Sequence, residues 1–318
     1  MGEFELIQRY FRPLSHNRGS EALVLGIGDD CAVQRIPQGR DLVFSIDTMV
    51  EGVHFPTRYA PEKLAWRALA AATSDLAAMG ANPVCFTLAL TLPEPGEPWL
   101  DAFAKGLATA SKAFGIALAG GDTTRGALSL SIQVHGTVPC GEAITRSGAQ
   151  GGDLVCVSGT LGDAAGALRY LDSEIGGSDV SALLDRYHHP VPRLELGEAL
   201  IGVASAAIDV SDGLIADLGH ILASSDVGAE VDVYRLPLSS ALKRLAGERA
   251  VEFALHGGDD YELCVTLPPG KWDELDESVR SALTVIGRIE ERAGLRASGT
   301  GQQELVNLSG FDHFRSVK

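Results

Sequence analysis

Apolar and polar positions in the first half of the chain repeat with the periods of helices and strands. Residues 3–14 carry apolar side chains at helical spacing, and the alanine- and leucine-rich stretch 61–80 begins at a proline and ends at a glycine, as helices commonly do. Residues 41–47 and 84–92 are short apolar runs of the kind that form buried strands. The same patterns predict a further helix at 99–114 and further strands at 116–119 and 128–138.

The second half begins after a small, polar and glycine-rich segment, 147–153, which is typical of a domain boundary. We therefore predict two domains, 1–148 and 149–318. Beyond the boundary, the pattern predicts helices at 162–171, 193–204 and 212–224 and strands at 154–158, 229–233, 261–267 and 283–288. Strands and helices mixed in this way favour an α/β or α+β fold in two domains.

The composition indicates a folded protein without a nucleic-acid or membrane partner. Hydrophobic residues make up 45% of the 318 residues, enough for a sizeable core, and the net charge of −16 leaves no basic footprint for nucleic acid. No uncharged apolar stretch reaches the roughly 18–20 residues that cross a bilayer, and residues 1–10 lack the apolar core of a signal peptide. The five cysteines form no C-x-x-C pair, which argues against a zinc site and a disulfide framework. We expect a cytoplasmic protein.

Six segments join an apolar run to glycine, serine or threonine and at least one aspartate. Each has an ordinary structural explanation when taken alone, because Gly-Asp pairs are common in turns and a single histidine is more often structural than functional. Together they concentrate many carboxylates at the junctions where chemistry is expected. They are Gly26–Ala32, Ser45–Phe55, Thr73–Pro83, Ala119–Thr124, Ile208–Leu214 and His256–Leu263.

These carboxylates favour a site that binds Mg²⁺ and a nucleotide. Mg²⁺ prefers oxygen ligands, and carboxylates that converge without a cation would repel one another strongly. Several Mg²⁺ ions that bridge to a nucleoside triphosphate would remove that repulsion, while Arg125 and Arg146 are suited to contact a terminal phosphate. The chain has neither a Walker A sequence nor a protein-kinase glycine loop, so any nucleotide site is of another type.

The same segments, in the same order, resemble those of the thiamine-monophosphate kinase family. The resemblance runs from about residue 3 to about residue 314 and includes two further segments, Thr145–Ala149 and Gly310–Phe314. Single motifs also occur in the wider superfamily of aminoimidazole-ribonucleotide synthetase, selenophosphate synthetase and a hydrogenase maturation factor. The Glu-Gly-Val-His-Phe segment at 51–55 and the segment Gly310–Phe314 are more specific to the kinase family.

The resemblance implies a two-domain α/β fold like that of aminoimidazole-ribonucleotide synthetase and a homodimer formed through the N-terminal sheets. It also implies that ATP phosphorylates thiamine monophosphate to thiamine diphosphate with the help of several Mg²⁺ ions. Domain 1–148 would bind ATP and Mg²⁺, and domain 149–318 would complete the site. The implied metal ligands are Asp30, Ser45, Ile46, Asp47, Asp75, Asp122, Asp209 and Asp212. The implied nucleotide contacts are Gly121, Asp122, Arg146 and Ser211, the substrate contacts are His54, Asp259 and Phe311, and the catalytic residues are Asp47, Asp122 and Arg146.

Two positions depart from the family pattern, which usually has threonine in place of Ile46 and glutamate in place of Asp259. Ile46 can serve as a metal ligand only through its backbone carbonyl, and Asp259 is one methylene shorter than the usual residue. Two other functions stay open at this stage: another ATP-dependent synthetase of the superfamily, and a non-catalytic nucleotide or metal sensor. The sequence also leaves open the choice between Mg²⁺ and Mn²⁺, a need for K⁺, and the use of free thiamine.

Overall fold

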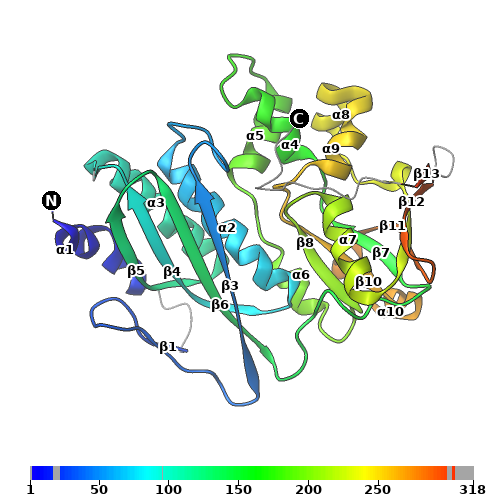
Figure 1. Ribbon diagram of the computed structural model, residues 1–318, viewed down its shortest axis with the longest axis horizontal. Coiled ribbons are helices and arrows are strands. Elements are labelled where there is room, and N and C mark those ends of the chain that lie inside the picture. Colours follow the sequence, from blue (N-terminus) through cyan, green and yellow to red (C-terminus); the bar gives the residue numbers. More distant parts are fainter. Residues whose placement is uncertain (1, 17–21, 95, 299–302, 305–318) are drawn as a thin grey trace. The chain divides into compact units, whose positions relative to one another are not determined.

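The computed structural model describes residues 2–16, 22–94, 96–298 and 303–304, and the chain divides into two compact units (Figure 1). Unit 1 comprises Met1–Leu76 and Ala81–Ala143, and unit 2 comprises Ala77–Gly80 and Ile144–Lys318. The domain limits 1–148 and 149–318, with the roles assigned to each domain, stay a prediction. Among the described residues, no helix is both long and apolar enough to cross a membrane.

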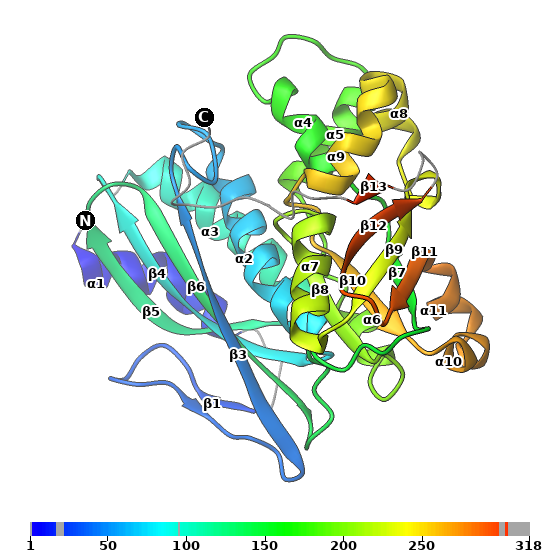
Figure 2. The ribbon, with the colours of Figure 1, turned by 45° about the vertical axis from the view of Figure 1, so that its right-hand side comes forward.

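Unit 1 is built on a four-stranded sheet with two long helices on one face (Figures 1 and 2). β4 and β5 run parallel, as the helix between them requires, and the other pairs are antiparallel. In spatial order the strands are β3 (Arg40–Val50), β6 (Ser129–Pro139), β4 (Asn82–Leu92) and β5 (Ala117–Arg125). The helices are α2 (Pro61–Ala78) and α3 (Glu97–Phe114), which confirm the predicted helices at 61–80 and 99–114.

The other face of this sheet leaves apolar side chains of β3 exposed. Val43 and Met49 are buried, whereas Phe44 is 61% and Ile46 is 62% exposed. Successive side chains of a strand point to opposite faces, so this alternation means that only one face of β3 is covered. The predicted strand at 41–47 is therefore present, but the prediction that it is buried is wrong for one of its two faces.

The N-terminal segment is helical, as predicted for 3–14, but in three short pieces of different type. They are α1 (Glu3–Leu6), the π-helix η1 (Ile7–Phe11) and the 3₁₀-helix η2 (Arg12–His16). A two-stranded sheet follows, formed by β1 (Leu23–Leu25) and β2 (Val33–Gln34). These two strands bracket the acidic loop at 26–32.

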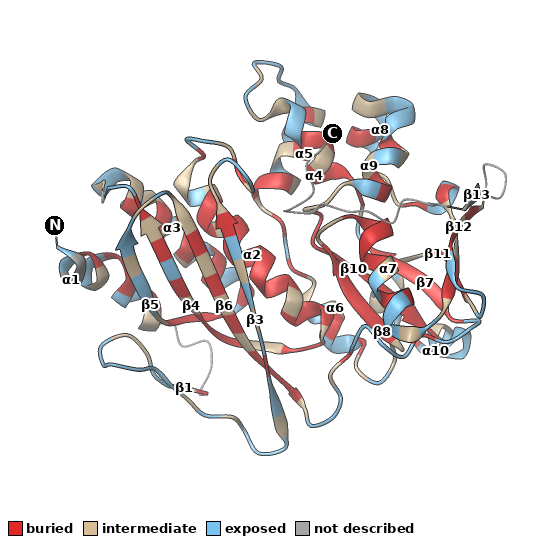
Figure 3. Ribbon diagram, in the orientation of Figure 1, coloured by how far each residue is buried: buried red, intermediate tan, exposed pale blue. Residues whose placement is uncertain are grey.

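Unit 2 contains a seven-stranded sheet in which the three strands at one end, β7, β10 and β8, are wholly buried (Figure 3). Strands buried on both faces read as continuous apolar runs, which is why 154–158 and 261–267 were predicted correctly. In spatial order the strands are β13 (Gln303–Glu304), β12 (Gly294–Ser298), β9 (Gly228–Asp232), β11 (Leu283–Glu290), β7 (Leu154–Ser158), β10 (Glu262–Leu267) and β8 (Ala206–Val210).

Helices pack around this sheet, and several of them are shorter than predicted. The α-helices are α4 (Asp163–Ala167), α5 (Ser178–His188), α6 (Leu194–Ala199), α7 (Leu214–Ser225), α8 (Ser240–Ala246), α9 (Ala250–His256), α10 (Pro269–Glu274) and α11 (Glu277–Ser281). Three 3₁₀ turns are η3 (Leu168–Tyr170), η4 (Val233–Arg235) and η5 (Gly247–Arg249). The sequence predicted α4, α6 and α7 but none of the helices α5, α8, α9, α10 and α11. The mixed α/β class is confirmed.

Candidate functional site

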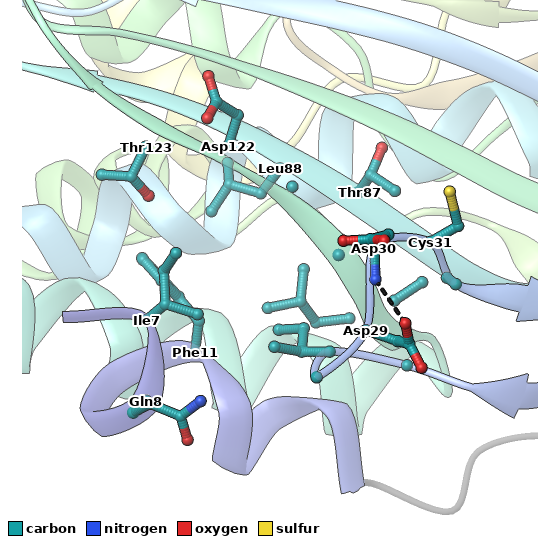
Figure 4. A pocket seen from close by; sticks show the side chains of 18 residues that line it. Ile7, Gln8, Phe11, Asp29, Asp30, Cys31, Thr87, Leu88, Asp122 and Thr123 are labelled. Carbon is teal, nitrogen blue, oxygen red and sulfur yellow. Dashed lines mark hydrogen bonds between the residues drawn. The ribbon is translucent and has the colours of Figure 1, made fainter. Parts of the chain in front are cut away.

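A pocket of about 560 Å³ in unit 1 brings two predicted acidic segments together (Figure 4). Asp29 and Asp30 come from the loop after β1, and Asp122 comes from β5. The helical N-terminal segment contributes the apolar side chains of Ile7 and Phe11. Carboxylates and glycines beside an apolar wall suit a ligand with a charged end and a flat apolar end, as a nucleotide has.

The acidic loop of this pocket packs directly on the N-terminal segment. Ser15 Oγ accepts a hydrogen bond from Ile27 N at 3.0 Å, and a Cβ added to Gly26 would lie 1.9 Å from that oxygen. Asp29 then accepts a hydrogen bond from Asp30 N at 2.9 Å, drawn as a dashed line in Figure 4. A larger residue at position 26 would therefore displace the Ser15 hydroxyl from this hydrogen bond. The loop presents the Asp30 carboxylate at the surface of the pocket.

Strand β5 carries the glycines and the aspartate of the second segment. The sequence predicted that the strand would end at residue 119, but β5 continues to Arg125, so Gly121 and Asp122 lie within it. Gly121 has a φ of +154°, and a Cβ there would lie 1.9 Å from the carbonyl oxygen of Leu88 on β4. The glycine is thus required by the strand pairing itself, in addition to any contact with a ligand.

Replacing Gly121 by alanine is expected to destabilise the protein by at least about 1–3 kcal/mol, because the added Cβ meets backbone atoms and the φ is unfavourable for alanine. Gly120 is the matched control, since a Cβ there meets nothing within 4 Å. Urea unfolding of both variants measures the difference. Equal midpoints for Gly120→Ala and Gly121→Ala would contradict the close approach.

Strand β3 places Ser45 and Asp47 on the face covered by helices. Ser45 Oγ donates a short hydrogen bond to Asp75 Oδ2, which reaches it from α2. Asp75 therefore points at the sheet, although aspartate is a poor residue for a helix interior. Ile46 points to the opposite, exposed face, so its side chain cannot join these oxygens and only its backbone carbonyl is available.

The turn after β3 holds His54 in a defined orientation. His54 N donates to Val50 O at 3.0 Å, and Val50 N donates to His54 Nδ1 at 3.0 Å. A ring whose Nδ1 accepts carries its proton on Nε2 when it is neutral. The guanidinium of Arg67, a residue only 1% exposed, donates to the His54 carbonyl at 3.5 Å from beneath the turn.

In unit 2, two loops that carry predicted site residues are joined to each other. Asp209 is buried near the end of β8, and Ser211 lies in the turn between β8 and α7. Ser211 O accepts a hydrogen bond from Asp259 N at 2.9 Å, and a Cβ on Gly258 would lie 2.3 Å from the same oxygen. Ser211, a predicted nucleotide contact, and Asp259, a predicted substrate contact, are therefore joined by a backbone hydrogen bond.

The second of these loops is strained around Asp259. Asp259 and Tyr261 both adopt positive φ, at 69° and 51°, and Tyr261 Oη donates to Asp259 Oδ1 at 3.0 Å. Between them, the fully buried Asp260 accepts a hydrogen bond from Gly162 N at 2.6 Å, and burial raises its pKa well above the ordinary value. Strained non-glycine residues of this kind concentrate at ligand sites.

Five buried carboxylates in the described part of unit 2 are not among the predicted site residues, although Asp260 and Glu262 lie within the predicted segment His256–Leu263. The other three are Asp153, Asp163 and Asp217. Burial raises the pKa of Asp217 to about 7, against the lowering effect of hydrogen bonds from the backbone of the preceding loop. A signal was present for Asp217, because an acidic residue in the first turn of a helix often binds backbone N–H groups. No comparable signal distinguished Glu262.

Two predicted residues lie apart from these assemblies or cannot be placed. Arg146 is exposed, and it lies in a loop whose backbone is held by the side chain of Ser225. Ser225 Oγ donates a hydrogen bond to Arg146 O at 3.3 Å and accepts one from Gly148 N at 3.2 Å. Phe311 and the rest of Gly310–Phe314 lie outside the described residues.

The donor chemistry fits Mg²⁺ bound together with phosphate oxygens. Among the described residues, no group of three or more His, Cys, Asp or Glu side chains is placed to hold a metal ion by itself. Asp30 and Asp122 nevertheless line one pocket, and Ser45 contacts Asp75. Mg²⁺ usually takes one or two carboxylates and completes its shell with water and phosphate, so a dedicated protein cage is not needed.

Comparisons with known proteins show which proteins this chain is similar to. Residues 28–138 match the family model of the N-terminal domain of AIR synthase related proteins, and residues 150–299 match that of the C-terminal domain. The thiamine-monophosphate kinase of Haemophilus influenzae is 46% identical over 100% of this chain and 99% of its own length. The crystal structure of the Stenotrophomonas maltophilia thiamine-monophosphate kinase has a TM-score of 0.86 at 46% identity, covering 94% of this chain and 97% of that one. The structure of AaThiL complexed with AMPPCP and TMP has a TM-score of 0.80 at 32% identity, and the match covers 98% of this chain and 97% of AaThiL.

Proposed function

Because the chain belongs to the thiamine-monophosphate kinase family, we propose that it transfers the γ-phosphoryl group of ATP to thiamine monophosphate, giving ADP and thiamine diphosphate. The observation that carries this proposal is the similarity to such kinases over the full length, at 46% identity. The complex of AaThiL with AMPPCP, an ATP analogue, and TMP supports the same pair of substrates. The pocket of unit 1, with its carboxylates, glycines and apolar wall, is suited to the nucleotide.

The proposed reaction needs no general base. The nucleophile is a phosphate oxygen of thiamine monophosphate, which is already anionic near neutral pH. The bond between the γ-phosphorus and the bridging oxygen of ATP breaks as the new bond to the acceptor oxygen forms, and ADP leaves with the electron pair. Catalysis then depends on in-line positioning of two anions and on neutralisation of their charge.

We propose that carboxylates in each unit are ligands of Mg²⁺ ions. When bound, Mg²⁺ supplies positive charge beside phosphate oxygens that would otherwise repel each other. The proposed ligands are Asp30, Ser45, the Ile46 carbonyl, Asp47, Asp75 and Asp122 in unit 1, and Asp209 and Asp212 in unit 2. Asp47, Asp122 and Arg146 are the proposed catalytic residues, and Gly121, Arg146 and Ser211 the proposed nucleotide contacts.

We propose His54, Asp259 and Phe311 as contacts to thiamine monophosphate. His54 is held by the turn after β3, and Asp259 is held in a strained loop by Tyr261. Asp259 is one methylene shorter than the glutamate usual at this position. The backbone bond from Asp259 N to Ser211 O fixes this shorter side chain close to the turn after β8.

We also propose that a second copy of the chain covers the exposed face of β3. Phe44 and Ile46 are both more than 60% exposed there, although β-sheet faces with large apolar side chains are usually covered. Light scattering should give twice the mass of one chain, and a monomer at micromolar concentration would contradict the homodimer.

All five cysteines are unbonded, which supports a reducing, cytoplasmic location.

The function is tested by coupling ADP release to a spectrophotometric assay with ATP and Mg²⁺. Three reactions are compared: thiamine monophosphate, free thiamine and no acceptor, with products separated by chromatography. We expect thiamine diphosphate and ADP only with the monophosphate, and no reaction after Mg²⁺ is removed by EDTA. Absence of acceptor-dependent ADP would contradict the proposed function and favour a nucleotide or metal sensor.

A further inference from the structure

One buried carboxylate of unit 2 is bound to the backbone of the turn that carries Ser211 and Asp212. Asp217 is only 2% exposed and lies in the first turn of α7. Its Oδ2 atom accepts hydrogen bonds from Ser211 N and from Asp212 N, both at 3.0 Å. Its own N–H donates to Gly213 O at 3.0 Å, so the side chain and the backbone of Asp217 both bind the same turn.

Consecutive backbone N–H groups that converge on one point form an anion-binding nest. Such nests often hold a phosphate group at the beginning of a helix. Here the nest is filled by a carboxylate of the chain itself. A phosphate oxygen of a ligand therefore cannot bind these two N–H groups. A ligand at this turn would instead contact its side chains.

The turn also determines where the neighbouring loop lies. Ser211 O accepts the hydrogen bond from Asp259 N, and a Cβ on Gly213 would lie 2.8 Å from the carbonyl carbon and oxygen of His256. The loop and the turn thus touch through backbone atoms on both sides. A shift of the turn would be transmitted to Asp259, since there is no flexible side chain between them to absorb it.

We propose that Asp217 is a positioning residue for the phosphoryl-transfer site: its carboxylate fixes the backbone of the turn at 211–213 and, through Ser211, the loop that carries Asp259. This inference rests on the proposed function. It assigns to Asp217 no contact with the substrates, and it predicts that Mg²⁺-nucleotide binding and acceptor binding both depend on this one side chain.

The test compares Asp217→Ala with Asp153→Ala. Asp153 is also buried in unit 2, and its Oδ2 accepts from Gln150 N at 3.0 Å and from Ser205 Oγ at 2.6 Å, but none of these residues belongs to the proposed site. The two replacements therefore remove similar bonds at two different places. Calorimetry measures binding of AMPPCP at a series of Mg²⁺ concentrations, and steady-state kinetics give the KM for thiamine monophosphate.

We expect Asp217→Ala to weaken Mg²⁺-AMPPCP binding and to raise the KM for thiamine monophosphate by about tenfold or more each, because small misplacements of binding groups have large effects. Asp153→Ala should lower the unfolding temperature but leave both constants within about twofold. Asp217→Asn, which keeps an acceptor oxygen, should recover much of the lost binding. If Asp217→Ala does not fold, Asp217→Leu, which has the branching of aspartate but no acceptor oxygen, serves as the test.

Constants for Asp217→Ala, or for a folded Asp217→Leu used in its place, that equal those of Asp153→Ala would overturn the positioning role. That result leaves the proposed function intact if the wild type still forms thiamine diphosphate. A wild type that binds no Mg²⁺-AMPPCP would instead overturn the proposed function, and the inference with it.

Discussion

Replacing Glu262 by glutamine is expected to lower the free energy of unfolding by about 3–5 kcal/mol, the usual cost of removing one partner from a buried ion pair. Glu262 is fully buried at the start of β10. Its Oε1 atom accepts from the guanidinium groups of Arg186 and Arg193, both at 2.5 Å, and Oε2 accepts from Ser158 Oγ at 2.5 Å. Glutamine would leave two positive charges facing a neutral amide whose NH₂ group cannot accept from them.

The effect should depend on pH in a defined direction. Burial alone would raise the pKa of Glu262, but the hydrogen bond from Arg193 and the charges of Arg193 and Arg186 hold that pKa below its ordinary value of 4.5. A group whose pKa is lowered on folding contributes stability above its unfolded pKa and loses it as the pH falls through the folded pKa. The difference between wild type and variant should therefore be full at neutral pH and shrink under acid conditions below about pH 4.5.

Urea unfolding at pH 7 and at pH 4 measures this difference. The matched control is Asp179→Asn, which removes a two-bond ion pair with the exposed Arg244 at the surface of unit 2. Surface pairs contribute about 0–1 kcal/mol, so this control should change stability little. Similar losses for the two variants would show that the Glu262 cluster is not a buried charge network.

Replacing Asp122 by alanine is expected to lower kcat by at least about 10²-fold, the usual effect of removing one group that stabilises the charge of a transition state. Asp122 is exposed within β5 and lines the unit 1 pocket, where we propose that it holds Mg²⁺ against the phosphates of ATP. Because the side chain is exposed, its loss should change the free energy of unfolding by less than about 0.5 kcal/mol. Activity and stability should therefore separate.

Asp172→Asn is the control for this variant, since Asp172 is an exposed carboxylate outside the proposed site. Initial rates with saturating ATP and thiamine monophosphate, together with thermal unfolding curves, distinguish the two replacements. We expect unchanged melting curves for both variants and lost turnover only for Asp122→Ala. Normal turnover in Asp122→Ala would remove Asp122 from the metal ligands and from catalysis.

Long, periodic elements of the fold could be predicted from the sequence, whereas exposure could not. Helix α2 has a proline at its first residue and Gly80 beyond its last, and β7 is a continuous apolar run, so both were found close to their true ends. Strand β3 has the same local pattern as a buried strand. Its exposed Phe44 depends on which face of the sheet receives the helices, which is decided by tertiary packing rather than by local sequence.

Helix α5 was missed because only three apolar residues of its inner face, Val180, Leu183 and Tyr187, are buried in a polar stretch. The spacing of these three residues is that of a helix, but a short, glycine-opened segment after a polar loop gave no other sign of one. Helices of this length depend on tertiary contacts for most of their stability. Their limits are therefore poorly determined by the segment itself.

For the site, aspartates beside glycines were predictable, but the residues that hold them were not. Asp30 and Asp122 lie in one pocket, as the motif pattern suggested they could. The hydrogen bonds that position these residues join parts of the chain that no single motif contains. Examples are the bond from Ser45 to Asp75 and the bonds from the turn at 211–213 to Asp217. Pairings of this kind arise from the fold, so a single sequence gives little indication of them.

In the proposed reaction, a phosphoryl group moves directly from ATP to the phosphate of thiamine monophosphate. The most direct test uses ATP labelled with ³²P at the γ-phosphate and follows the label by chromatography after one turnover. We expect label in the terminal phosphate of thiamine diphosphate, in amounts equal to the ADP formed. Label recovered as inorganic phosphate, with thiamine monophosphate unchanged or converted to another product, would contradict direct transfer and indicate a synthetase-type reaction instead.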